Sequence, residues 1–105
     1  MKKNSLAREL RHRRGLIESA DATVVECRRL TSTPIDAGAT AARQWRRAAK
    51  LSVAAAGSYQ QAGLGLLAIE AWSAAAACYE SLGLEKERTR CETSATAVPR
   101  FYDEG

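Results

Sequence analysis

Apolar residues recur along most of the chain every three or four positions, the spacing that gathers them on one face of an α-helix. Two segments, Ala56–Leu64 and Ala76–Leu84, are near-copies in which Ala is followed by Tyr and then by Gly-Leu. A glycine directly after such an apolar run fits the left-handed backbone position that closes a helix. These glycines therefore mark two helix ends. The helix predicted between them, Leu66–Leu82, is apolar on most faces, so neighbouring helices must bury it.

The first predicted helix begins with a cap at Asn4 or Ser5 and ends near Leu30. One apolar seam runs along it at alternating spacings of four and three. Weak helix formers at Gly15 and over Ser19–Thr23 predict a kink or break in its middle. The seam, which Arg13 interrupts, consists of Leu6, Leu10, Arg13, Ile17, Ala20, Val24 and Cys27.

The second predicted helix has the best-marked start in the chain. Thr33-Pro34-Ile35-Asp36 supplies a hydroxyl cap, a proline at the first helical position and a carboxylate facing the helix dipole. The pattern predicts a helix from Pro34 to about Ala62. A polar fourth helix follows at about Leu84–Ala97 and ends at Val98-Pro99, and residues 98–105 are expected to form a mobile tail.

Composition strengthens the all-α prediction. Alanine occupies 21 of the 105 positions, and alanine favours the helix more than any other residue. The length suits a single domain, 1–105, comprising a basic N-terminal helix (1–30), alanine-rich hairpins (34–97) and the tail. We therefore predict a four-helix bundle or a short helical array. Its closely packed helices should bury Trp72 and Tyr79 where the third helix meets its neighbours.

Charge is distributed unevenly along the chain. Residues 1–50 carry a net charge of +7, and residues 51–105 carry −3. Two interpretations remain open for the cations of the first half, namely solvated helix faces or a surface that binds an acidic partner or phosphates. The candidate partner-binding residues are Arg8, Arg11, Arg14, Arg43, Arg46, Arg47 and Lys50.

Little in the sequence indicates catalysis. His12 is the only histidine, and the chain contains no glycine-rich phosphate loop or nucleophile elbow. The odd number of cysteines, three, and their spacing argue against a disulfide framework or a zinc site and favour a reducing cytoplasm. The most apolar window, Leu64–Tyr79, is shorter than the roughly 20 residues that span a bilayer. We expect a non-enzymatic protein without cofactor, metal or membrane segment.

A local motif resembles a known repeat family. Tyr59 precedes Gly63 by four positions, and a small, an aromatic and a small residue follow at Ala68, Trp72 and Ala75. This pattern resembles the tetratricopeptide repeat, and its continuation through Tyr79-Glu80-Ser81-Leu82-Gly83-Leu84-Glu85-Lys86 is similar to the SNAP-like variant. The resemblance covers about Arg43 to Thr93. It implies stacked helical hairpins in which aromatic rings fill the wedges between small residues.

Two classes of function follow from these features. The first is a protein–protein interaction module, an adaptor or a subunit of a larger assembly, which uses a groove of helices two to four or the basic first half. The second is a helical accessory protein that binds nucleic-acid phosphates without sequence specificity. A homo-oligomer or a permanent complex with another protein is expected, since so few hairpins leave apolar faces uncovered.

Overall fold

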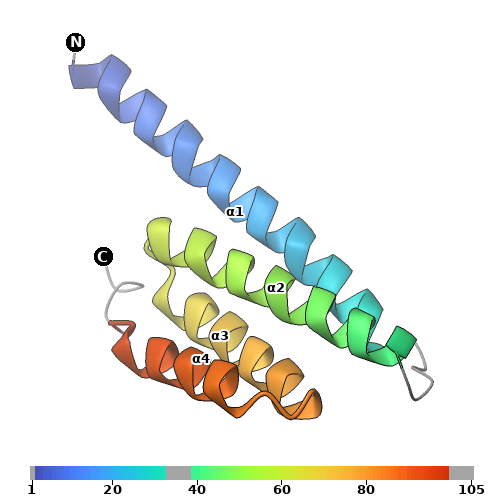
Figure 1. Cartoon of the computed structure of the whole chain (residues 1–105). Coiled ribbons are helices and arrows are strands. Elements are labelled where there is room, and N and C mark those ends of the chain that lie inside the picture. The colour runs from blue at the N-terminus through green and yellow to red at the C-terminus, as the bar shows by residue number, and fades with distance from the viewer. Residues whose placement is uncertain (1, 33–38, 100–105) are drawn as a thin grey trace.

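The structure, a computed structural model, describes residues 2–32 and 39–99, apart from the side chains of residues 2–4 and 39. These residues form α1 (Lys2–Ser32), α2 (Ala39–Gln61), α3 (Gly65–Ser81) and α4 (Glu85–Ala97) (Figure 1). The described part of the chain is therefore all-α, with four helices packed against one another. The predicted bounds of the third and fourth helices agree to within one residue. The predicted start of the second helix at 33–36 and most of the tail lie outside the described residues.

Helix α1 is continuous through its middle, so the predicted kink or break near Gly15 and Ser19–Thr23 is wrong. A glycine inside a helix costs only about 1 kcal/mol, which packing elsewhere on the helix can offset. Thr23 satisfies its hydroxyl within the helix by donating to the carbonyl oxygen of Ser19 at 2.8 Å. Ala20, inside this segment, is 1% exposed and anchors it in the core.

The two repeated helix endings are confirmed as matching turns. Gly63 and Gly83 have φ angles of +79° and +71°, the left-handed values that favour glycine. In the first turn, the amide of Leu64 donates to the carbonyl of Tyr59 at 2.9 Å, and in the second Leu84 donates to Tyr79 at 3.0 Å. These bonds satisfy carbonyls that the helix end leaves open.

The helices pack in sequence order, so that the large interfaces join α1 to α2, α2 to α3 and α3 to α4. Consecutive helices run antiparallel, as Figure 1 shows. The resulting molecule is elongated, with principal extents of 56 × 24 × 17 Å. Helix α2 lies between α1 and α3 and packs on both of them.

The core of the described residues is built from small side chains. Ala48, Ala49, Ala56, Ala68 and Ala75 are each 0% exposed, whereas no large side chain is fully buried. Alanine faces let helix backbones approach closely. The expectation that Trp72 and Tyr79 are buried is too strong, because both rings are only partly buried at the edges of the alanine clusters. Tyr59 is the aromatic residue that the core does bury, at 4% exposure, among Ala20, Ala55 and Ala68.

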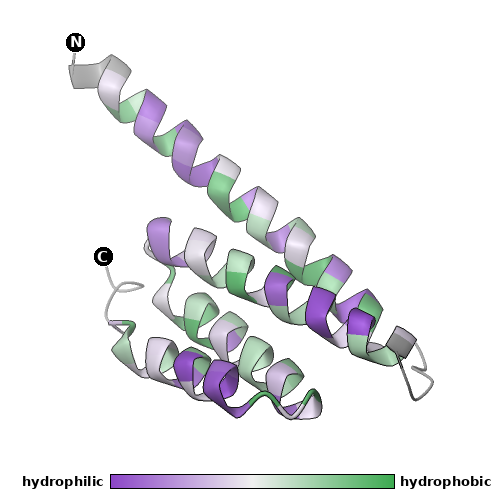
Figure 2. Cartoon of the chain, viewed as in Figure 1, coloured by the Kyte–Doolittle hydropathy of each residue, from purple (hydrophilic) through white to green (hydrophobic). Residues whose placement is uncertain are grey.

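The N-terminal end of α1 extends beyond the rest of the fold (Figure 1). A hydrogen bond of 2.7 Å from Arg13 Nε to the carbonyl oxygen of Ala62 joins α1 to the end of α2. Before this point Leu6 and Leu10 are 57% and 56% exposed. We call residues 2–12 the free end of α1. Figure 2 shows apolar and polar bands alternating along it.

Candidate functional site

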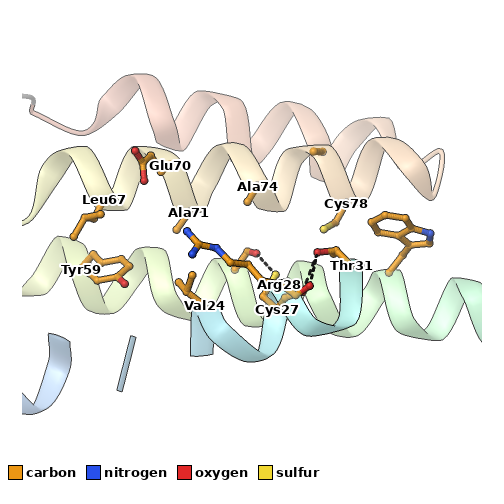
Figure 3. Close-up of a pocket in the computed structure, with 13 residues that line it drawn as sticks. Val24, Cys27, Arg28, Thr31, Tyr59, Leu67, Glu70, Ala71, Ala74 and Cys78 are labelled. Carbon is orange, nitrogen blue, oxygen red and sulfur yellow. Dashed lines mark hydrogen bonds between the residues drawn. The ribbon is translucent and has the colours of Figure 1, made fainter. Parts of the chain in front are cut away.

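A groove bounded by α1, α2 and α3 has a volume of about 330 Å³ (Figure 3). Helix α1 contributes Val24, Cys27, Arg28 and Thr31. Helix α2 contributes Trp45, Ser52 and Tyr59. Helix α3 contributes Leu67, Glu70, Ala71, Ala74, Ala77 and Cys78. The sequence suggested a groove of helices two to four or the basic first half, whereas this groove lies between the first three helices.

The groove is apolar because α3 is apolar on more faces than its neighbours can cover. Helix α2 buries one side of α3 and α4 buries another, which leaves Leu67, Ala74 and Ala77 exposed toward the groove. Leu67 remains 39% exposed. The wall of the groove on α3 is therefore apolar and open to water.

The floor of the groove contains two buried thiols, Cys27 and Cys78. Cys27 Sγ lies 3.0 Å from Ser52 Oγ and 3.4 Å from the carbonyl oxygen of Ala48. Burial, with a smaller contribution from Cys27, raises the pKa of Cys78 to about 11. Buried thiols behave as small apolar groups, and the raised pKa of Cys78 makes that thiol a poor nucleophile, so the floor is suited to hydrophobic contact.

One end of the groove carries acidic groups. The Tyr59 hydroxyl donates a hydrogen bond of 2.5 Å to Asp21 Oδ1. Burial and this contact raise the pKa of Tyr59 to about 12. Glu70 stands on the α3 side, and Figure 3 shows Arg28 directed from α1 toward α3. Within the described residues, neither Asp21 nor Glu70 forms an ion pair.

The predicted binding cations of the second helix gather on one outer face of α2. Arg43, Arg46, Arg47 and Lys50 are all exposed and, with Leu51, line one depression of the surface. The sequence contains no nearby acid along this helix, but the fold brings one from α1. Arg47 Nη2 lies 3.8 Å from Glu26 Oε1, which also binds Arg29 at 2.6 Å.

The remaining predicted cations, Arg8, Arg11 and Arg14, lie at the opposite end of the molecule. They are exposed on α1 near or beyond the end of α2, whereas the other set occupies the first turns of α2. From Arg43 to Ala62 the helix rises about 28 Å. The structure thus separates the predicted binding residues into two sites.

Sequence reasoning missed the groove residues as a site. The signal that could have indicated the groove is the apolar character of α3 at Leu67, Ala74 and Ala77. A helix that is apolar on all sides cannot be buried completely by two neighbouring helices, so part of it stays exposed. Which faces those neighbours leave open depends on tertiary packing, which periodicity alone does not determine.

Other kinds of site find no support in the described ranges 2–32 and 39–99. No three His, Cys, Asp or Glu side chains gather there in a way that could hold a metal ion. Nor does any helix in these ranges combine the length and apolar character required to cross a bilayer. No family model matches the chain, and comparison with curated proteins and with solved structures found no match.

Proposed function

We propose that this protein is a non-catalytic protein–protein interaction module whose groove between α1, α2 and α3 binds the apolar face of a helix. The observation that carries the proposal is the uncovered apolar wall of α3 facing α1 across a groove of about 330 Å³. Helix-in-groove recognition uses such a surface, with apolar anchors on the bound helix and polar groups at the rim. Arg28 and Glu70 supply those rim groups.

The proposed module is built from stacked helical hairpins similar to tetratricopeptide repeats. Supporting features are the repeated Gly turns, the close alanine packing and the large interfaces between consecutive helices. Arrays of this type use their exposed faces for binding. The three free, buried cysteines agree with residence in a reducing compartment such as the cytoplasm.

Site-specific photo-crosslinking tests the groove. Ala74 and Ser73 are neighbours on α3 and both are exposed, but only Ala74 lines the groove. A benzophenone amino acid at Ala74, in the chain expressed in its own host, should form an adduct with one apolar helical segment, mapped by mass spectrometry. The same group at Ser73 should give little or none of this adduct.

A second variant links the adduct to the groove surface. Ala77→Glu places a charge on the apolar wall and should abolish the Ala74 adduct, since burying an unpaired carboxylate is costly. The variant should keep its helix content by circular dichroism, because Ala77 is exposed. Equal adducts at Ala74 and Ser73, or an adduct that survives Ala77→Glu, would contradict the proposal.

One observation favours a second candidate function, binding of nucleic-acid phosphates. Arg43, Arg46 and Lys50 line a single depression, and none of them forms an ion pair within the described residues. Cations arranged in this way neutralise phosphates irrespective of sequence. The test is a salt titration with random-sequence single- and double-stranded oligonucleotides.

If the cations bind phosphates, the logarithm of affinity falls with the logarithm of salt by about 0.9 per phosphate on duplex and about 0.7 on single strands. Arg43→Glu with Lys50→Glu should flatten that slope. Arg8→Glu with Arg11→Glu is the matched control, since it makes the same charge change at the other end of the molecule. Absence of binding at low salt would remove this function.

A further inference from the structure

We infer that the chain forms a symmetric dimer in which the free end of α1 from each copy lies in the groove of the other. This inference rests on the proposed function, because it names the helix that occupies the groove. It is carried by the match between two uncovered surfaces of the same chain, the free end and the groove. They correspond in apolar character, in length and in charge.

The apolar match involves leucines that no other part of the described chain covers. Leu6 and Leu10 are more than half exposed, four residues apart on one face of α1. In a helix this spacing places both on one face, as in the anchors of helices that bind grooves. The groove offers Leu67 and Ala74, also exposed, as the opposing surface. Docking would remove both apolar surfaces from water.

The two surfaces also agree in length. The free end, residues 2–12, extends about 16 Å at 1.5 Å per residue. The groove wall on α3 reaches from Leu67 to Cys78, which is also about 16 Å. A bound free end would therefore cover the whole wall without projecting far beyond it.

Charge is complementary between the two surfaces. Arg8, Arg11 and Arg14 are exposed, and no ion pair within the described residues neutralises them. Near Tyr59 the groove is lined by Glu70, and Asp21 lies beside it on α1; neither forms an ion pair within the described residues, while Arg28 lines the groove further along α1. Two free ends packed on each other would instead bring these like charges together, which favours the groove as the docking site.

A row of residues spaced seven apart on α1 indicates where the two-fold axis of the dimer would lie. Leu10, Ile17, Val24 and Thr31 recur every seven residues along one line of the helix. Val24 and Thr31 line the groove, and Ile17 is partly exposed between the groove and the free end. Antiparallel pairing of two α1 helices about Ile17 sets Leu10 opposite Val24 of the second copy and Arg14 beside its Asp21. Such a two-fold arrangement is closed, because each copy gives and receives one helix end.

Disulfide trapping tests this register directly. In a background of Cys27→Ala, Cys78→Ala and Cys91→Ala, the pair Leu10→Cys with Val24→Cys should form a covalent dimer on mild oxidation. Within one chain the two positions are about 21 Å apart along α1, far beyond the roughly 4.4–6.8 Å between the Cα atoms of a disulfide. A bond between positions 10 and 24 therefore requires two chains.

The matched control uses the adjacent residue. Val25 is 65% exposed and does not line the groove, so Leu10→Cys with Val25→Cys should give little covalent dimer. The triple-alanine background must show the helix content and sedimentation coefficient of the native chain. Equal crosslinking of both pairs, or crosslinking of neither, would overturn the inferred register.

Sedimentation equilibrium tests the dimer without crosslinks. The native chain should be dimeric at tens of micromolar, and Leu10→Glu should weaken association by about 100-fold, since both symmetric contacts lose a buried leucine. Val25→Glu introduces the same charge outside the groove and should leave the dimer intact. Both variants should remain folded, because each alters an exposed side chain.

The outcomes separate this inference from the proposed function. A monomeric native chain whose Ala74 photo-adduct is another protein overturns the dimer and supports the helix-binding groove. A dimer whose Ala74 adduct maps to residues 2–12 supports both. A dimer that survives Leu10→Glu, with equal adducts at Ala74 and Ser73, overturns both.

Discussion

Enlarging one core alanine tests whether the helices are packed as closely as the structure shows. Ala56 on α2 is 0% exposed and belongs to the cluster that also contains Ala20, Ala55 and Ala68. It does not line the groove between α1, α2 and α3, so no space there can receive added atoms. Ala56→Leu adds three carbon atoms within a cluster to which α1, α2 and α3 all contribute.

Two opposing effects determine how much Ala56→Leu changes the free energy of unfolding. If the three added carbons found room, their burial would stabilise the fold by up to about 2.4 kcal/mol, at about 0.8 kcal/mol per methylene. In a filled core, they displace backbones and side chains at a cost of about 1–3 kcal/mol. Because Ala56 is 0% exposed and Ala20, Ala55 and Ala68 in its cluster are at most 1% exposed, we expect the second effect to prevail and the free energy of unfolding to fall by about 1–3 kcal/mol.

Urea denaturation followed by circular dichroism measures the change in unfolding free energy. Ala54→Leu is the matched control, since Ala54 lies on the same helix but is exposed. The control should differ from the native chain by less than about 0.5 kcal/mol. An Ala56→Leu protein that is as stable as the native chain, or more stable, would show that the helices are not in close contact there.

Three further predictions concern backbone, acid–base and thiol chemistry. In the same urea assay, Gly57→Ala should raise the free energy of unfolding by about 0.5–1 kcal/mol, because alanine favours the helix and its added Cβ meets nothing within 4 Å. Gly63→Ala should lower the free energy of unfolding by about 1–2 kcal/mol. Its Cβ also meets nothing within 4 Å, but Gly63 has a positive φ, which strains an alanine. Since burial and Asp21 raise the pKa of Tyr59 to about 12, the stability present below pH 10 should be lost as pH rises toward 12. Absorbance titration of Asp21→Asn should show a lower Tyr59 pKa that still exceeds 10, as the burial remains; an unchanged pKa would contradict the assigned contact. At pH 8, Cys78 should react with iodoacetamide at least about 100-fold more slowly in the folded chain than in urea. The reason is that its pKa in the folded chain, about 11, lies two units above the ordinary value of 9.0, so less thiolate is present. Equal reaction rates would contradict the burial of Cys78.

Local signals account for the part of the fold that was predicted correctly. Gly63 and Gly83 mark helix ends whatever the helices pack against, because the left-handed position is a property of the local backbone. Alanine content and apolar spacing likewise predicted helices α3 and α4 to within one residue. Gly15 shows where local signals fail, since tertiary packing of Ala20 maintains the helix through it.

The candidate site was harder to predict because it depends on which helices meet. The exposed state of Arg43, Arg46, Arg47 and Lys50 agrees with the sequence interpretation, whereas their separation from the cations of α1 follows from the antiparallel pairing of α1 and α2. Contact of Glu26 with Arg47 joins residues on different helices and has no sequence signature. The groove itself exists because α1 and α3 both pack on α2 and leave an opening between them.

The sequential packing of the helices has a consequence for the way the molecule opens. Helix α2 is held on both sides by large interfaces with α1 and α3, and α3 by interfaces with α2 and α4, whereas α1 and α4 each have one. Native-state hydrogen exchange should therefore be graded, with the slowest amides in α2 and α3 and faster ones in α4 and in the free end of α1. A chain of nearest-neighbour interfaces also allows growth at its ends, so another helical hairpin could be added after α4 without rebuilding the rest.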